Sequence, residues 1–317
     1  MDPNACCTPP GTSLRGAVNR ALAATEAGLS ADARRATVAL PGGTFLMGAN
    51  FVGAFPADGE GPVRPVVIRS FEIDVFPVTN GDSAEFVEAT GFRTDAEILG
   101  WSFVFWGHIP EDRFDDLVRE TVPGAPWWCK IEGACWSQPE GPGSNLAGRS
   151  NHPVVHVSWN DASEYALRAG KSLPTEAQWE YAARGGLEQR LYPWGDELTP
   201  DGKHMCNIWQ GEFPWKDAAE DGFAGTCPVD SFPPNGFGLY SMSGNTWEWC
   251  ADWFQSSFSA LPAAQDPEGP AEGDGKVMKG GSFLCHASYC NRYRVGARTH
   301  NSPDSSTSNA GFRCVKN

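Results

Sequence analysis

Two cysteines near the end of the chain place the strictest demand on its fold. Cys285 and Cys290 stand five positions apart in the tract 280–294, GGSFLCHASYCNRYR. Fully extended, five residues span roughly 17 Å, whereas a disulfide needs its two Cα atoms within about 7 Å. A helix does not bring the side chains together either, because five steps of about 100° leave them on different faces. The backbone must therefore turn back on itself here if the two sulfurs are to meet.

The spacing leaves three kinds of chemistry open for the pair: a disulfide, a thiol catalyst, or a site for a soft monovalent metal. Neither a two-residue redox spacing nor a four-ligand zinc pattern surrounds it. Thiolates select Cu(I) among the common biological metals, and this ion accepts low coordination numbers. An ordinary disulfide fits the spacing equally well. Ser282, His286 and Tyr289 stand beside the pair, where they can hydrogen-bond a substrate, a water molecule or a sulfur, or only stabilise the loop.

Glycine, proline and tryptophan are abundant and predict a loop-rich fold packed by aromatic side chains. The 317 residues include 36 Gly, 25 Pro and 13 Trp, and 41% are hydrophobic, which is enough for one large domain or at most two. We expect residues 1–36 to form a polar leader, partly helical over 14–29, and residues 37–317 to form a single domain. Almost no helical periodicity follows Gly186, so bound cations and packed tryptophans are expected to hold the remaining loops.

Short strands and capped helices predict a mixed α+β fold. The clearest strands are 66–68 and 71–75, the second of which alternates apolar and polar residues. Three helices are marked by capping residues before them and glycines after them. They begin at Thr79 or Asn80 and end at Gly91, begin after Asn160 and end at Gly170, and begin at the capping box Thr175-Glu176-Ala177-Gln178 and end at Gly185-Gly186.

Two carboxylates on the third helix have the spacing of an acid–base pair, but we predict a structural role for both. Glu176 lies in the first helical turn, where the helix dipole favours an acidic residue. Glu180 shares its face and is expected to be solvated.

Two oxygen-rich loops are candidates for calcium. The first holds Asn207 and Asp221, and the second runs from Ser241 to Glu248. Calcium binds six to eight oxygens, many of them backbone carbonyls, which such loops leave available. Asx turns explain the same residues without a metal, so their pattern alone does not decide.

Charge and motif content exclude several classes of function. The formal net charge of -15 argues against nucleic acid or an anionic membrane as the main partner. No apolar run approaches the roughly 20 residues of a membrane span, and no secretory signal is visible, so we expect a cytoplasmic location. The six histidines lack a zinc-hydrolase spacing, and neither a phosphate loop nor a nucleophile elbow is present.

Among the ten cysteines, the pairs Cys129/Cys135 and Cys206/Cys227 are expected as disulfides in an oxidising compartment or as thiols in a reducing one.

Several motifs together resemble the formylglycine-generating enzymes, the sulfatase-modifying factor family, in their bacterial type. The likeness covers about residues 37–317, nearly everything but the leader. The Cys-x-x-x-x-Cys tract with its preceding serine is the most specific motif, because the others occur across a wider superfamily. The segments that carry the resemblance are His152-Pro153-Val154-Val155-His156-Val157-Ser158-Trp159-Asn160-Asp161, Leu173-Pro174-Thr175-Glu176, 207–214 (NIWQGEFP), 244–249 (GNTWEW) and 280–314, including Asn301-Ser302-Pro303-Asp304-Ser305-Ser306.

The resemblance implies a fold and a reaction. The fold is a variant of the C-type lectin-like architecture with little regular secondary structure and bound structural calcium. The reaction oxidises the cysteine of an unfolded sulfatase segment, Cys-x-Pro-x-Arg, to Cα-formylglycine with O2 and a thiol reductant. The enzyme is expected to be a monomer with no nucleic acid or membrane partner.

Site residues carry over from the resemblance one by one. Cys285 and Cys290 would hold Cu(I), the substrate thiolate would be a third sulfur ligand, and Ser282 would lie beside the reacting sulfur. Four residues would border the substrate pocket: Trp247, His286, Tyr289 and Asn309. One calcium ion would be held by Asn207, the Ile208 carbonyl, Asp221 and the Phe223 carbonyl, and a second by Ser241, the Gly244 and Thr246 carbonyls, and Glu248.

The chain also departs from the family pattern. Ser241 stands where the animal enzymes carry asparagine, which weakens the expectation of the second calcium ion. Where the secretory-pathway enzymes pair cysteines, this chain has Ala166, Ala183 and Val295, and Cys314 lacks its expected partner. These departures fit a bacterial cytosolic enzyme.

Two rival functions remain open at this point. An iron-dependent sulfoxide synthase of the same superfamily would need a histidine-rich helical domain, for which the leader is too short. A non-catalytic lectin-like binding module would use Cys285 and Cys290 as a plain disulfide. Uptake of Cu(I) by the reduced protein separates this module from the oxidase.

Overall fold

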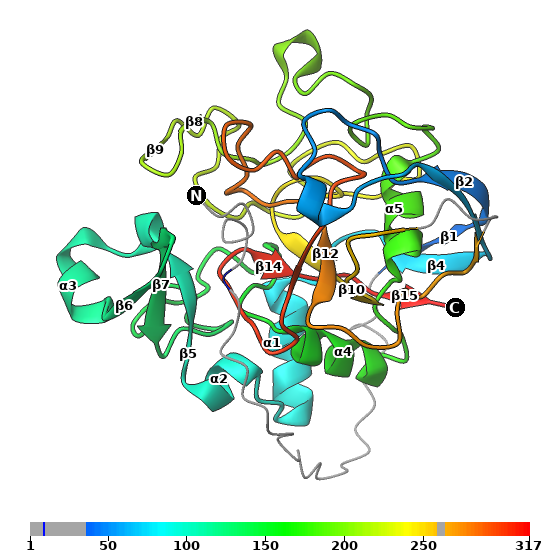
Figure 1. Cartoon of the computed structure of the whole chain (residues 1–317). Helices are drawn as coiled ribbons and strands as arrows, with labels where there is room; N and C mark the ends of the chain where they lie inside the picture. Colours follow the sequence, from blue (N-terminus) through cyan, green and yellow to red (C-terminus); the bar gives the residue numbers. More distant parts are fainter. Residues whose placement is uncertain (1–8, 10–35, 259–263) are drawn as a thin grey trace.

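The structure, a computed structural model, describes residue 9 and residues 36–258 and 264–317 (Figure 1). Its described part mixes short helices, small sheets and long loops. The helices are α1 (Asn80–Thr90), α2 (Asp95–Leu99), α3 (Phe114–Leu117), α4 (Trp159–Arg168) and α5 (Glu176–Arg184), with 3-10 turns at η2 (Pro56–Asp58), η3 (Trp106–His108), η4 (Glu111–Arg113) and η5 (Pro200–Gly202). The strands are β1 (Thr37–Leu40), β2 (Gly43–Met47), β3 (Arg64–Ile68), β4 (Phe71–Asp74), β5 (Trp101–Phe105), β6 (Glu120–Val122), β7 (Ala125–Glu132), β8 (Gly211–Glu212), β9 (Lys216–Asp217), β10 (Trp247–Trp253), β11 (Ala264–Gln265), β12 (Lys276–Lys279), β13 (Thr299–Asn301), β14 (Ala310–Gly311) and β15 (Val315–Lys316).

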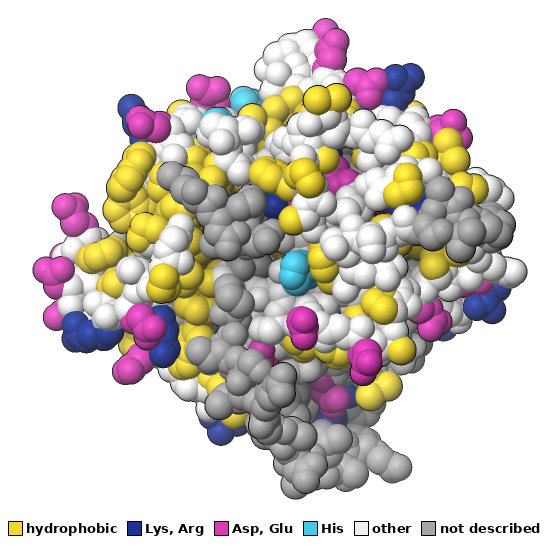
Figure 2. Space-filling view, in the orientation of Figure 1, with side chains coloured by type: hydrophobic (Ala, Val, Ile, Leu, Met, Phe, Trp, Pro, Cys, Tyr) yellow, Lys and Arg dark blue, Asp and Glu magenta, His cyan; other side chains and the backbone are white. Residues whose placement is uncertain are grey.

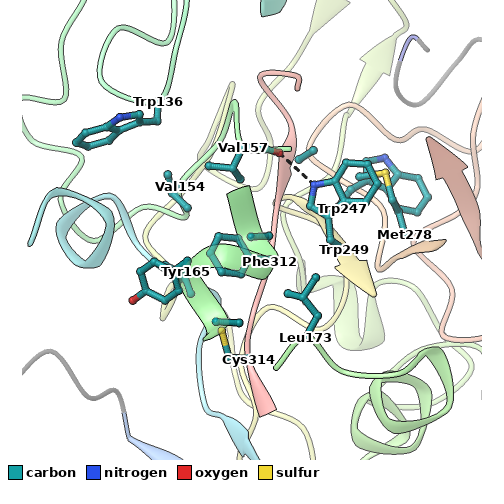
Figure 3. Packing of buried hydrophobic residues seen from close by; sticks show 14 of the residues in the cluster. Trp136, Val154, Val157, Tyr165, Leu173, Trp247, Trp249, Met278, Phe312 and Cys314 are labelled. Atoms are coloured by element: carbon teal, nitrogen blue, oxygen red, sulfur yellow. Dashed lines mark hydrogen bonds between the residues drawn. The ribbon is translucent and has the colours of Figure 1, made fainter. Parts of the chain in front are cut away.

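A four-stranded sheet in the order β13-β12-β10-β14 lies at the centre of the molecule (Figure 1). Trp249 of β10 stands opposite Met278 of β12, and Trp247 stands opposite Ala310 of β14. Both tryptophans are buried in the core shown in Figure 3, where the Trp249 indole donates to the Val157 carbonyl at 3.1 Å. The cysteine tract begins directly after β12, and β14 follows Asn309. The central sheet therefore positions both segments of the candidate site.

The first and last described strands share one sheet. In the order β1-β4-β15, Ile73 of β4 pairs with Val38 on one side and with Val315 on the other. This pairing confirms the strand predicted over 71–75, and β3 confirms the strand predicted over 66–68. The C-terminal segment is thereby tied into the start of the domain.

Two of the three predicted helices begin and end as expected, and the third has a different cap. Thr79 forms a capping box with Asp82 at the start of α1, and Thr175 forms one with Gln178 at the start of α5. The prediction that Asn160 precedes the remaining helix is wrong, because Ser158 is its N-cap: its hydroxyl accepts from the Asp161 N–H. No α-helix forms after Gly186 within the described residues, as the lack of periodicity predicted.

The prediction that Glu180 is solvated is also wrong. Glu180 is 1% exposed and forms ion pairs with Lys279 (3.0 Å) and Arg184 (2.6 Å). Burial alone would raise the pKa of Glu180, but Lys279 and Arg184 lower it to about 2. Because α5 packs against the central sheet, its acidic face meets buried cations rather than water. The structural role predicted for Glu176 and Glu180 fits these contacts.

A three-stranded sheet in the order β5-β7-β6 projects from the body together with α3 (Figure 1). None of the strands of this sheet was predicted from the sequence. Phe103 of β5 bridges to Thr307, which joins this sheet to the segment that leads to Asn309. Hydrophobic side chains gather at this side of the molecule in Figure 2. The projecting sheet thus forms one border of the region around the cysteine tract.

The prediction of a partly helical leader lies outside the described residues, apart from Pro9. Among the described helices, none is long and apolar enough to cross a bilayer. The mixed α+β composition agrees with the predicted fold class.

His156 links the projecting sheet to the core and should make stability pH-dependent. Its ring is fully buried, with Nδ1 2.7 Å from Ser102 Oγ and Nε2 2.8 Å from the Pro139 carbonyl. Because a carbonyl only accepts, Nε2 carries the proton, and Nδ1 faces the Ser102 hydroxyl, which also lies 2.9 Å from the Ser306 carbonyl. Burial lowers the pKa of His156 to about 4, against about 6.5 in an unfolded chain.

As pH falls below 6.5, the unfolded chain binds this proton before the folded one, so folding stability decreases until about pH 4. Between pH 7 and pH 5 we expect this group to remove about 2 kcal/mol of unfolding free energy. The variant H156N suits the position's φ of 58°, since asparagine tolerates this conformation. Urea unfolding at both pH values should show a smaller pH difference in H156N than in the wild type or in the control H204N. An unchanged difference in H156N would contradict the assignment.

Candidate active site

The tract between Cys285 and Cys290 folds into a tight turn, as the spacing required. The Cys290 N–H donates to the His286 carbonyl at 2.7 Å, and the Cys285 N–H donates to the Ser282 carbonyl at 2.9 Å. The two sulfurs come within 3.2 Å, well beyond the roughly 2.05 Å of a disulfide bond. Both cysteines are buried, with 2% and 1% of their surface exposed. The structure therefore brings the two sulfurs side by side without a bond between them.

Ser282 and Asn309 form a polar group against this pair. The Ser282 N–H points at Cys285 Sγ (3.4 Å), and its hydroxyl accepts from Asn309 Nδ2 at 3.0 Å. Thr307 Oγ1 donates to Asn309 Oδ1 at 2.7 Å, which fixes the orientation of the amide. All three polar residues are buried. The structure thus brings two predicted site residues, Ser282 and Asn309, into direct contact beside the sulfurs.

Gly281 lets the tract lie close to its own continuation. Its φ is +73°, and a Cβ at this position would lie 2.9 Å from the Tyr293 Cα. Any larger residue would push the two backbone segments apart. The glycine before Ser282 is therefore required by the close return of the chain.

Arg292 places a buried positive charge beside Cys290. Its Nη1 lies 3.8 Å from Cys290 Sγ, and its guanidinium forms a two-point ion pair with Asp58 of η2 at 2.5 and 3.1 Å. Arg292 is fully buried, and Asp58 is 3% exposed. Two residues further on, Arg294 makes a similar pair with Glu60 (2.6 and 2.7 Å). The loop 58–60 thereby anchors the chain that follows the cysteines.

An aromatic wall adjoins the turn. The Tyr289 ring stacks on Phe213 with 4.6 Å between centroids and meets Trp127 edge-on at 5.1 Å. The Trp209 N–H donates to the Cys285 carbonyl at 3.1 Å, which ties the loop 207–214 to the cysteine tract. Further out, Trp215 is 67% exposed and packs on Trp106. Tyr289 thus lies where an apolar part of a peptide can contact it.

The other two predicted pocket residues, His286 and Trp247, differ from each other in how deeply they are buried. His286 is half-buried and borders a pocket of 250 Å³ together with Gln210 and Glu220. Trp247 is fully buried in the core, and its backbone N–H donates to the Asn309 carbonyl at 2.9 Å. Trp247 thereby holds the backbone at Asn309 from the core side.

The first predicted calcium set is gathered in one place and fits a cation. Asn207 Oδ1 is buried and has no hydrogen-bond partner among the described residues. Asp221 Oδ2 accepts from the Ile208 N–H at 3.1 Å, and Asp221 Oδ1 accepts from the Phe223 N–H at 3.0 Å. The Gln210 amide nitrogen contacts both the Ile208 carbonyl and Asp221 Oδ2 (2.8 Å), so a donor already lies between these two oxygens. A cation bound here would take the Asn207 oxygen as a ligand, and the Gln210 amide would have to turn away from the Ile208 carbonyl and Asp221.

The second predicted set fits less well. Both Glu248 oxygens accept from Arg313 at 2.7 Å, and one also accepts from the Trp179 indole at 2.7 Å. The Ser241 hydroxyl donates to the Val229 carbonyl at 3.0 Å. The carboxylate expected to bind the ion is therefore neutralised by a buried arginine, and Gly244 and Thr246 contribute only carbonyls. We carry only the first set forward.

Calcium should stabilise the protein through Asp221. With free calcium at about 100 times the dissociation constant, binding to the folded state alone adds about 2.7 kcal/mol of unfolding free energy. We expect D221N to lose this gain, because the carboxylate supplies the site's charge. The matched control D217N changes a nearby carboxylate that accepts from the Gln210 and Ala219 N–H groups. Calorimetry with calcium and with chelator measures the effect, and an equal gain in D221N and the wild type would refute the assignment.

None of the eight described cysteines is in a disulfide. Cys206 and Cys227 are both buried, and burial raises the pKa of the Cys227 thiol to about 11. Burial likewise raises the pKa of Cys129 to about 11. Among the predicted alternatives for these pairs, the structure matches the thiol form.

Sequence reasoning missed Asp58, Arg292 and Phe213 as parts of the site. Asp58 and Arg292 are 234 positions apart, and no local pattern connects them. Phe213 appeared in the sequence analysis only as one residue of the segment 207–214. The one available signal was an arginine two residues after the second cysteine, since an arginine that is buried requires an acidic partner.

The comparisons with known proteins all indicate the same family. Residues 24–317 match the model of the sulfatase-modifying factor enzyme 1-like domain. The chain is 60% identical over 281 residues to the formylglycine-generating enzyme of Thermomonospora curvata, covering 88% of this chain and 92% of that protein. It is 46% identical over 281 residues to a Bos taurus protein named inactive C-alpha-formylglycine-generating enzyme 2, covering 88% and 87%. Among solved structures, PvdO from Pseudomonas aeruginosa superposes with a TM-score of 0.66 and 26% identity, covering 92% of this chain and 99% of that one.

The chain therefore belongs to the formylglycine-generating enzyme family of sulfatase-modifying factors. Its fold is the C-type lectin-like variant of that family, as the resemblance implied. The family includes proteins named as enzymes and proteins named as inactive, so the site itself must carry the functional conclusion.

Proposed function

We propose that this protein oxidises the cysteine of a sulfatase Cys-x-Pro-x-Arg segment to Cα-formylglycine, with O2 as oxidant and Cu(I) as cofactor. The observation that carries the proposal is the buried, reduced pair Cys285–Cys290, whose sulfurs lie 3.2 Å apart beside the bonded Ser282 and Asn309. The names of the similar proteins support the same product, and the description of the matching family model supports sulfatase modification. We further propose a cytoplasmic monomer that acts on unfolded sulfatase chains.

Cys285 and Cys290 fit Cu(I), because two soft thiolates are already placed together in a buried turn. Within residues 36–258 and 264–317, no third Cys, His, Asp or Glu joins them to form a metal cluster. Bound Cu(I) would supply the one-electron chemistry through which O2 reacts with a thiol. The guanidinium of Arg292 would offset the negative charge that deprotonated thiols accumulate.

The overall reaction balances with a thiol reductant. The substrate loses its Cβ–S bond and one Cβ–H bond, a C=O bond forms, and the sulfur leaves as hydrogen sulfide. This change releases two electrons. O2 accepts four electrons in forming water, so two more come from a reducing thiol, which becomes a disulfide.

The remaining site residues bind and orient the substrate. Asn309, held by Thr307, fixes the Ser282 hydroxyl next to Cys285, where it can accept or donate a hydrogen bond at the substrate sulfur. The aromatic wall of Tyr289, Phe213 and Trp127 offers a rigid apolar surface to the proline of the motif. The buried turn limits the access of water to the sulfurs.

The binding-module alternative and the oxidase predict different outcomes in one experiment. A Cys-x-Pro-x-Arg peptide is incubated with the Cu(I)-loaded protein, O2 and a thiol, and aldehyde is measured by mass spectrometry. We expect aldehyde that depends on both copper and O2, and none from the same peptide with serine in place of cysteine. Peptide binding without any aldehyde would favour the module and contradict the oxidase.

A further inference from the structure

One tryptophan of this protein lies mostly in water, close to the candidate active site. All 13 tryptophans belong to the part of the chain that the structure describes, and Trp215 is the exposed one, at 67%. It stands in the turn between β8 and β9, which lie at the periphery of the molecule in Figure 1. A single exposed apolar side chain is ordinary, whereas a contiguous apolar patch marks a binding surface. The neighbours of Trp215 therefore decide its meaning.

The hairpin presents the Trp215 ring on a fixed backbone. Glu212 of β8 stands opposite Lys216 of β9, and the Trp215 N–H donates to the Glu212 carbonyl at 2.8 Å. The Ala218 N–H donates to the Gln210 carbonyl at 2.6 Å, which closes the base of the hairpin. A partner that contacts the ring would therefore not have to order this backbone first.

Trp106 joins Trp215 to form an apolar corner. The two rings meet edge-on with 5.1 Å between their centroids. The Trp106 indole N–H donates to the Pro214 carbonyl at 3.2 Å, so the polar group of this ring is already satisfied by the hairpin. Trp106 itself begins η3, directly after β5. The corner is thus built from two separate segments and presents apolar ring surface to the solvent.

The corner continues the aromatic wall of Tyr289, Phe213 and Trp127. Phe213 stacks on Tyr289 and precedes Trp215 by two residues. Phe105, which directly precedes Trp106, also faces Phe213, with 6.3 Å between the centroids. Figure 2 shows hydrophobic side chains gathered on this side of the molecule. The apolar surface therefore extends from the turn between the two cysteines outward to the tip of the hairpin.

We propose that Trp215 and Trp106 form a subsite for a large apolar side chain directly outside the Cys-x-Pro-x-Arg motif, in the same unfolded sulfatase segment. This inference rests on the proposed function, which places the proline of the motif on the aromatic wall. The first residue outside the motif, on either side, is three positions from that proline, roughly 10 Å along an extended chain. The Cα atoms of Phe213 and Trp215 are at most about 7 Å apart, so the corner lies within this reach.

The charges around the corner favour an apolar occupant over an ion. Glu212 and Lys216 carry opposite charges and stand opposite each other across the hairpin. The nearby Asp217 carboxylate accepts from the backbone N–H groups of Gln210 and Ala219 at 3.1 and 3.0 Å. The corner thus offers ring surface without a net charge beside it, which suits an aliphatic or aromatic side chain.

A binding measurement without catalysis tests the subsite. Three fluorescent Ser-x-Pro-x-Arg peptides are compared by anisotropy on the reduced, metal-free full chain. One peptide has leucine directly before the motif, one has leucine directly after it, and the third has serine at both positions. We expect the wild type to bind at least one leucine peptide about tenfold more tightly than the serine peptide, because leucine loses exposed apolar surface on the two rings.

The variant W215A should lose most of this preference for leucine, and W215F should keep most of it. Because Trp215 is largely exposed, neither change disturbs the core. The matched control L167A removes an apolar side chain of similar exposure (70%) on α4, which Figure 1 shows well away from β8 and β9. L167A should bind all three peptides as the wild type does.

Three results would overturn the subsite: a wild type that shows no leucine preference, a W215A variant that retains it, or a W215A variant that loses affinity equally for all three peptides. The last result would place Trp215 against the motif itself. Because neither copper nor turnover is involved, a failure of the oxidase proposal would appear separately, as a cysteine peptide that binds with the leucine preference but yields no aldehyde. Aldehyde formed without any leucine preference would overturn the subsite alone.

Discussion

Replacing either Cys285 or Cys290 by alanine is expected to abolish both Cu(I) binding and aldehyde formation. With one thiol removed, the remaining sulfur has no partner at 3.2 Å, and the described residues offer no third ligand to replace it. A single thiolate then competes poorly with the thiol reductant in solution. Cu(I) is measured by competition with a chromophoric chelator, and aldehyde is measured on the Cys-x-Pro-x-Arg peptide.

The control for this experiment is C129A. Cys129 is equally buried, but it lies in β7 and packs in a separate apolar cluster. It should keep both copper binding and activity, apart from a modest loss of stability. Full activity in C285A or C290A would exclude the two-thiol site.

Replacing Arg292 by methionine should reduce both folding stability and Cu(I) affinity. Breaking a buried ion pair by removing one partner typically costs about 3–5 kcal/mol, because Asp58 would remain buried and uncompensated. The guanidinium also lies 3.8 Å from Cys290 Sγ. Loss of such a supporting contact at a metal site typically weakens metal affinity about 10–100-fold. Chemical unfolding and chelator competition measure the two effects.

Arg294 provides a matched control in the same tract. R294M breaks an equally buried pair with Glu60 but touches neither cysteine. It should lose a similar amount of stability and keep its Cu(I) affinity. The double variant D58N/R292M should recover part of the stability of R292M without recovering copper affinity. Equal copper affinity in R292M and R294M would show that Arg292 has only a structural role.

Local signals predicted the elements whose ends are fixed by neighbouring residues. Thr175 and Gln178 cap α5 through bonds that span one helical turn, so the sequence contains the whole interaction. Asn160 was a wrong choice for the cap of α4, because Ser158, two residues earlier, has the hydroxyl that reaches the Asp161 N–H. Glu180 was placed in water because helical position alone does not show that Lys279 and Arg184 meet it in the core.

The residues of the candidate site were also predicted from the sequence only where their contacts are local. The turn between Cys285 and Cys290 follows from their spacing, and Ser282 lies within the same tract. Asn309 came only from the family resemblance, and Trp209 was not predicted as a site residue, since their contacts with the tract depend on the tertiary fold. Asp58 was not predicted by either route, because Arg292, with which its carboxylate pairs, is 234 residues away.

Calcium illustrates a limit of motif transfer. Asn207 has a buried oxygen without a partner among the described residues, but the Gln210 amide already contacts both the Ile208 carbonyl and Asp221. Glu248 matches the family motif equally well, yet its carboxylate is paired with Arg313. A matching residue type in the sequence does not show whether its carboxylate is bound to a metal ion or paired with an arginine.

A Cu(I) titration of the reduced protein, with and without a Cys-x-Pro-x-Arg peptide, tests the central claim most directly. We expect one Cu(I) per chain, held by Cys285 and Cys290, and a higher affinity when the peptide supplies its thiolate. The serine form of the peptide should give no such increase. A protein that binds no Cu(I) when fully reduced, or binds it equally well as C285A/C290A, would contradict the account.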